Sequence, residues 1–150
     1  MKKIILLISL LLTFQCGYEP ILMSNSNSFG INEIKFNQKK LSGKIENRLK
    51  VYQNKNSVNN TFNLEISITE NKTVTLKDSK GDPLNFRINV DIELKVFENK
   101  KLLFTKIYTE NSDYKNTSKK FDLAQREREL KSSLINQITN NLIKDLHSIK

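Results

Sequence analysis

The chain has 150 residues and a net charge of +9, with 25 Lys or Arg residues against 16 Asp or Glu. This length allows one domain with a hydrophobic core of its own. The single cysteine, Cys16, excludes an intrachain disulfide and a metal site built from several thiolates.

The N-terminal residues have the pattern of an export signal. Lys2 and Lys3 precede an uncharged apolar run over residues 4–14. That run is too short to cross a bilayer, which takes about 20 residues of helix. We therefore predict a signal peptide over residues 1–15.

Cys16 lies where cleavage of this signal would fall. The position is similar to that in bacterial lipoproteins, whose cysteine becomes the lipid-bearing first residue. Those signals usually have Leu, a small residue and then Gly or Ala before the cysteine, whereas this chain has Thr13, Phe14 and Gln15. Two other readings stay open: an inert cysteine in an ordinary leader, or a membrane anchor formed by the apolar run. We expect Cys16 to be the lipid attachment site.

Export changes what the positive charge indicates. A chain that begins at Cys16 loses two lysines and keeps a net charge of +7. In an exported protein this excess favours anionic lipid, glycolipid phosphate or an acidic protein surface as partner. Nucleic acid is not expected, because only four of the basic residues are Arg and no ribonucleoprotein motif is present.

The first elements of the mature chain are short. Residues 16–28 are predicted to be a lipidated tether, since residues 24–28 read SNSNS. Residues 31–36 read as a short strand, and residues 39–52 as a short helix with one apolar face. That face consists of Leu41, Ile45 and Leu49.

Three long strands follow. Over residues 62–76 and 84–96, apolar side chains occupy even positions and polar ones the odd positions, so one face of each strand is buried. Residues 77–83 form a loop between them, and a tight turn near Asn99 and Lys100 leads into the third strand.

The last element is a long helix. Asp122 is expected to cap its first turn, with Gln125 in a capping-box position. Apolar residues then run along one side, namely Leu130, Leu134, Ile138, Leu142, Leu146 and Ile149, widened by Ile135 and Ile143. Residues 29–150 thus form one α+β domain of order β-α-β-β-β-α. We predict a mostly antiparallel four-stranded sheet with two helices on one face, because the apolar face of the sheet must be covered.

CGYEPIL at residues 16–22 resembles the mature N-terminus of the LPS-assembly lipoprotein family LptE, especially its alphaproteobacterial branch. There the cysteine is followed by Gly, an aromatic, a variable residue, Pro and an aliphatic residue. The element order is also similar, as is a late helix that opens with a charged run, here AQREREL at residues 124–130.

The resemblance implies a non-catalytic lipoprotein of the outer membrane, anchored on its periplasmic side by acylated Cys16. It would act as a plug and partner of the LptD β-barrel in the delivery of lipopolysaccharide to the cell surface. Gly17, in place of an Asp, leaves delivery to the outer membrane open. The alternative is a generic periplasm-facing lipoprotein that serves as a binding module or envelope-assembly adaptor.

Charge alone suggests which side chains meet glycolipid phosphates. The candidates cluster at the start of the last helix and at the tight turn: Lys119, Lys120, Arg126, Arg128, Lys131, Lys100 and Lys101. A solvated helix face and an exposed turn would have the same composition.

No enzyme motif is evident. The chain contains no HExxH, CxxC, glycine-rich phosphate loop or Ser-His-Asp order. His147, the only histidine, has no acidic or thiol partner at ligand spacing, so we expect it to be structural or incidental. We therefore predict no enzymatic activity, no cofactor and no metal; an exported hydrolase would need a nucleophile beside a base.

Overall fold

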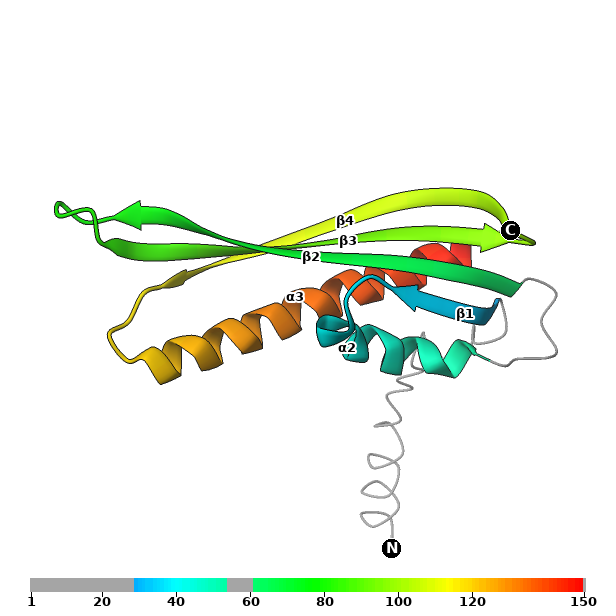
Figure 1. Cartoon of the computed structure of the whole chain (residues 1–150), viewed down its shortest axis with the longest axis horizontal. Helices are drawn as coiled ribbons and strands as arrows, with labels where there is room; N and C mark the ends of the chain where they lie inside the picture. The colour runs from blue at the N-terminus through cyan, green and yellow to red at the C-terminus, as the bar shows by residue number, and fades with distance from the viewer. Residues whose placement is uncertain (1–28, 54–60, 150) are drawn as a thin grey trace, which may run out of the picture.

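The computed structural model describes residues 29–53 and 61–149. They form a four-stranded sheet of order β1-β2-β3-β4, with both helices on one face (Figure 1). In chain order the elements are β1 (Gly30–Phe36), α2 (Lys39–Leu49), the 3-10 turn η2 (Lys50–Tyr52), β2 (Thr61–Lys77), β3 (Pro83–Glu98), β4 (Lys101–Lys115) and α3 (Lys120–Ser148). The predicted α+β class and element order are confirmed.

The sheet is mixed because its first connection is a crossover. β1 pairs in parallel with β2, and the chain between them carries α2, while the β2–β3 and β3–β4 pairs are antiparallel. Parallel neighbours need such a crossover, and a helix supplies it. The predicted signal peptide and tether, with Cys16, lie outside the described residues.

Alternation builds the core, as the sequence predicts. Ile68 and Ile92 are paired across β2 and β3 and are fully buried. From the other side α3 contributes Ile138, Leu142 and Leu146, all with no exposed surface. Burial of apolar surface between sheet and helix is the main stabilising term here.

The two turns have the backbone that tight reversals need. Asn99 and Lys100 both have positive φ, 48° and 68°, which a two-residue hairpin turn requires. At the β2–β3 turn Gly81 has φ 89°, and the Asp78 carboxylate accepts the backbone N–H groups of Lys80 and Asp82. Both predicted turns are confirmed.

The start of α3 differs from the prediction. The helix begins at Lys120, with Lys119 as N-cap and no side-chain cap. Asp122 therefore lies inside the first turn, and Gln125 donates to Glu129 instead of capping. The entry to the helix is fixed earlier by Asn116, whose amide donates to the Pro83 carbonyl and accepts the backbone N–H of Thr117.

The buried face also ends sooner than the alternation indicates. Val74, Leu76 and Leu84 are 41%, 51% and 43% exposed, although the sequence places them on the apolar face. The β2–β3 hairpin extends past both helices, so neither helix covers its tip (Figure 1). Register shifts on both sides of Leu76 further disturb the alternation there.

Candidate functional site

A cavity of about 580 Å³ opens between the start of α2, the middle of β2 and the first half of α3. Its walls combine apolar and charged side chains: Leu41, Gly43, Lys44, Glu70, Ala124, Glu127, Arg128, Lys131, Ser132 and Ile135. Its volume falls in the range of small-molecule sites. We take this charged cavity as the candidate site.

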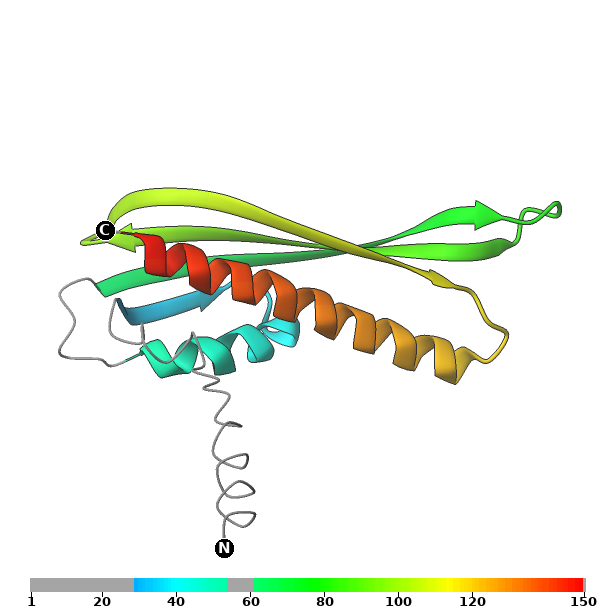
Figure 2. The ribbon, with the colours of Figure 1, turned by 180° about the vertical axis from the view of Figure 1, so that it is seen from behind.

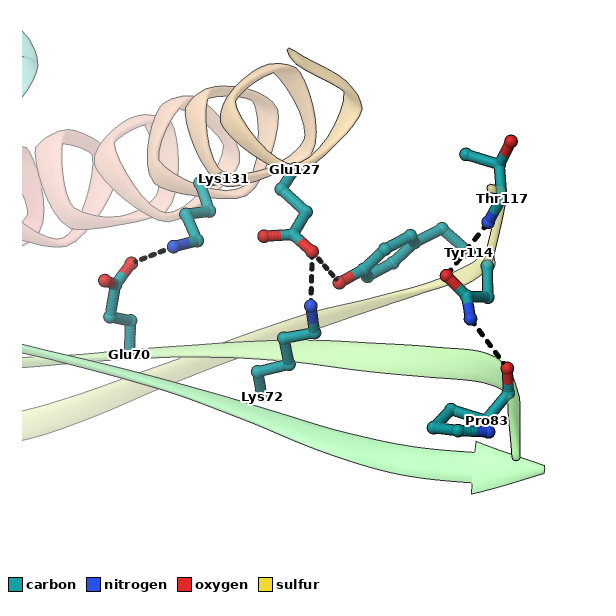
Figure 3. Close-up of polar contacts among 8 residues, drawn as sticks. Glu70, Lys72, Pro83, Tyr114, Thr117, Glu127 and Lys131 are labelled. Carbon is teal, nitrogen blue, oxygen red and sulfur yellow. Dashed lines mark hydrogen bonds and ion pairs between the residues drawn. The ribbon is translucent and has the colours of Figure 1, made fainter. Parts of the chain in front are cut away.

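Glu127 of α3 is the centre of a polar cluster on one wall. Its carboxylate accepts hydrogen bonds from the Tyr114 hydroxyl at 2.6 Å and from the Lys72 ammonium. One helical turn further on, Lys131 forms an ion pair with Glu70 of β2 at 2.8 Å. Figure 3 shows these side chains bridging the space between α3 and the strands. Here polar contacts add to the packing of Leu123 and Leu130 in joining the helix to the sheet.

The cluster fixes the charge of its carboxylate. Burial opposes ionisation of Glu127, but the hydrogen bonds from Lys72 and Tyr114 and the charges of Lys72 and Lys131 outweigh it, so the pKa of Glu127 lies below its usual value. Burial, together with the hydrogen bond to Glu127, raises the pKa of the Tyr114 hydroxyl. Near neutral pH the polar cluster therefore holds a carboxylate, which lines the cavity, and a neutral phenol behind it.

A second cluster repeats this arrangement near the C-terminus of α3. Asp145 accepts the Tyr108 hydroxyl at 2.7 Å and the Lys106 ammonium at 2.6 Å. Burial raises the pKa of Tyr108, whereas the bonds from Lys106 and Tyr108 lower the pKa of Asp145 despite its burial. Since this cluster does not line the cavity, it is best explained as a structural link between α3 and β4.

Two cations of the cavity wall are not neutralised by a carboxylate within the described residues. Lys44 donates to the Ser132 hydroxyl, and Arg128 is exposed and has no ion pair there. The two acids of the wall, Glu70 and Glu127, are paired with Lys131 and Lys72. The wall is therefore net positive and suits an anionic group.

The structure separates the predicted phosphate contacts into three groups. Arg128 and Lys131 line the charged cavity, while Lys119, Lys120 and Arg126 are exposed near the start of α3, outside it. Lys100 and Lys101 lie at the β3–β4 turn, at the opposite end of the sheet (Figure 1). There Lys100 lines a smaller cavity of about 200 Å³ with Glu33, Lys35 and Glu65.

The sequence analysis missed Lys44, Glu70 and Lys72. A signal for the last two was present, because charged residues at positions 70 and 72 interrupt an otherwise apolar even-numbered face of β2. Lys44 gave no such signal: on α2 it resembles any solvated lysine, and its contact with Ser132 spans 88 residues of sequence.

His147 lies in an aromatic cluster away from the cavity. Its ring meets Phe29 edge-on, with 4.9 Å between ring centroids, and its Nε2 is 3.3 Å from the Tyr52 hydroxyl. Phe29 and Tyr52 stack on each other at 4.6 Å. These contacts agree with the structural role expected for this histidine.

Residues 29–53 and 61–149 contain neither a metal-binding cluster nor a membrane-spanning helix. No group of three or more His, Cys, Asp or Glu side chains there could hold a metal ion. None of the helices in this part of the chain has the length and apolar character needed to cross a membrane.

The fold is similar to those of several solved bacterial lipoproteins. Rare lipoprotein B from Shewanella oneidensis superposes with a TM-score of 0.57 at 15% identity, over 78% of this chain and 95% of that one. A minor lipoprotein from Acinetobacter baumannii superposes with a TM-score of 0.61 at 12% identity, over 79% of this chain and 90% of that one. A putative lipoprotein from Caulobacter crescentus superposes with a TM-score of 0.56 at 9% identity, over 83% of this chain and 91% of that one.

Sequence comparison adds no family. No protein-family model matches the chain, and no curated protein matches it. At these identities the structural likeness shows the fold alone: an α+β domain of the kind found in bacterial lipoproteins.

Proposed function

We propose that this chain is a lipoprotein of the bacterial envelope that belongs to the LptE family. It would be anchored in the outer membrane through Cys16 and act, without catalysis, as a plug and partner of the LptD β-barrel in lipopolysaccharide assembly. The observation that carries the proposal is the fold, which is similar to those of solved lipoproteins. The predicted signal peptide over residues 1–15, followed by Cys16, supports it.

The distribution of polar groups supports this role. A plug in a barrel needs wet outer surfaces, because the barrel lumen is polar. On β2, and on β3 from Asn85 to Lys95, the face of the sheet away from the helices carries polar side chains. The exposed residues of α3 include Lys120, Arg126 and Lys144. Lys44 and Arg128 beside the charged cavity would offer charge-assisted hydrogen bonds to a glycolipid phosphate.

Partnership is tested by gentle solubilisation of outer membranes. The proposal expects the chain to co-purify with a much larger, heat-resistant β-barrel, and expects its depletion to reduce surface lipopolysaccharide. If the chain is recovered alone and depletion leaves surface lipopolysaccharide unchanged, a generic lipoprotein adaptor is the better description.

Anchoring is tested by Cys16→Ser. The variant should move from the membrane to the soluble fraction and should no longer incorporate radiolabelled fatty acid. A matched Ser28→Ala change in the predicted tether should leave both readouts as they are. Unaltered membrane association of the Cys16→Ser chain would favour an uncleaved anchor.

The phosphate contact is tested with two arginines of the same helix. Arg128 and Arg126 are both exposed, but only Arg128 lines the cavity. Arg128→Ala should weaken binding of purified lipopolysaccharide by about threefold to tenfold, and Arg126→Ala by much less. Equal effects of the two changes would mean that the cavity is not the contact.

A further inference from the structure

None of the described residues covers the second face of the sheet, and the middle of that face carries only polar side chains. The two helices lie on the other face, as both views show (Figures 1 and 2). Three consecutive rows across β2, β3 and β4 make up what we call the outer polar patch: Thr69–Asp91–Thr109, Asn71–Asn89–Asn111 and Thr73–Arg87–Asp113. Side chains of one row share a face because they are cross-strand neighbours.

The central row consists of three asparagines. Asn71 and Asn111 are exposed and Asn89 is half-buried. None of the three side-chain amides hydrogen-bonds to another described residue. Each amide offers two donors and a carbonyl acceptor, and neighbouring strands place the amides about 4.8 Å apart. The row is thus a regular array of hydrogen-bonding groups that the domain itself leaves unused.

The one cation beside this row, Arg87, is already compensated within the patch. Arg87 donates two hydrogen bonds to Asp113, at 2.7 and 2.8 Å, and Asp91 accepts the Thr109 hydroxyl at 2.6 Å. The pKa of Asp113 is lowered by the hydrogen bond from Arg87. In a chain with a net charge of +9, this patch carries one cation and two carboxylates. A near-neutral patch attracts neither phosphate backbones nor anionic lipid.

The patch also lacks the anchors of a protein interface. Such interfaces are centred on buried aromatic, Met or Arg side chains. The only one of these here is Arg87, which is held by Asp113. In the next row, just beyond the patch, Ile107 of β4 lies opposite Glu93 of β3. The apolar side chain of Ile107 is 64% exposed.

We propose that the outer polar patch binds a neutral, hydroxyl-rich oligosaccharide. A sugar hydroxyl both donates and accepts hydrogen bonds, and the amides of Asn71, Asn89 and Asn111 offer both kinds of partner: their nitrogens donate and their oxygens accept. The hydroxyls of Thr69 and Thr73 extend the array, and Ile107 offers contact to the C–H face of a sugar ring. This inference does not depend on the proposed function, because it concerns a different face and an uncharged ligand.

The test uses the full-length, ¹⁵N-labelled chain in detergent, titrated with maltohexaose and with chitohexaose. We expect backbone amide signals of the three rows to shift with a Kd of about 1 mM, while signals of α2 stay in place. The triple variant Asn71→Val, Asn89→Val, Asn111→Val should weaken binding at least about tenfold, because valine has no hydrogen-bonding side chain. Valine favours strands more than asparagine does, so loss of binding would not reflect loss of the sheet.

The control is Asn140→Ala, which removes an exposed amide from α3 instead of the sheet. It should bind like the unaltered chain. The proposal is overturned if neither hexasaccharide shifts the three rows at about 10 mM, or if the triple variant binds as well as the control. Neither result bears on barrel partnership, since both sugars lack lipid and phosphate.

Discussion

Replacement of Glu127 by Gln tests whether the polar cluster holds the first half of α3 to the sheet. Gln keeps a carbonyl acceptor for the Tyr114 hydroxyl but removes the charge that pairs with Lys72. The carboxylate is only 21% exposed, whereas the lysine side chain is 40% exposed, so solvent screens part of the attraction.

The expected loss of stability is modest. A partly exposed ion pair contributes up to about 1 kcal/mol, and the hydrogen bond from Tyr114 weakens when its acceptor becomes neutral. We therefore expect Glu127→Gln to lower the free energy of unfolding by about 1 kcal/mol and the Tm by about 3–6 °C.

The pH dependence gives the sharper test. The pKa of Glu127 is lowered in the folded state, so its contribution is complete above the unfolded value of about 4.3 and is lost as the pH falls through the folded value. Urea unfolding followed by circular dichroism should show the deficit at neutral pH. The deficit should shrink below the unfolded value and disappear at a pH low enough to protonate the native carboxyl as well.

Glu129→Gln is the matched control for this change. Glu129 is exposed on the same helix and accepts only the Gln125 amide, at 3.0 Å. Its replacement should change stability by less than about 0.5 kcal/mol. The reasoning is refuted if Glu127→Gln is as stable as the control at neutral pH, or if its deficit stays the same in acid.

Two further changes test the core and a turn. Leu142 is fully buried, so Leu142→Ala should lower the free energy of unfolding by about 2–5 kcal/mol, while Asn141→Ala on the exposed side should have little effect. Similar urea midpoints for the two would contradict the placement of α3. Lys100 has a φ of 68°, which glycine adopts more readily than lysine, so Lys100→Gly should raise the free energy of unfolding by about 0.5–1 kcal/mol in the same assay. A lower free energy of unfolding would mean that contacts of the lysine side chain matter more than its backbone conformation.

Part of the candidate site could be predicted from sequence. The charged opening of the last helix pointed to Arg128 and Lys131, and both line the cavity. Lys100 and Lys101 were selected by the same criterion, yet they lie at the other end of the sheet. Charge along a sequence shows which side chains are solvated but not which of them meet, because the cavity joins segments as distant as Lys44 and Ser132.

The sequence by itself determined the elements and their order. Period-two alternation in the strands and the apolar side of α3 follow from local geometry, because each element repeats its own burial pattern. Only the tertiary structure decided where that burial ends. On β2 the inner face is buried as far as Ile68, and beyond it Glu70 and Lys72 form ion pairs with Lys131 and Glu127 of α3. Val74 and Leu76 continue the alternation but stay exposed, because burial depends on what the rest of the chain places over a residue.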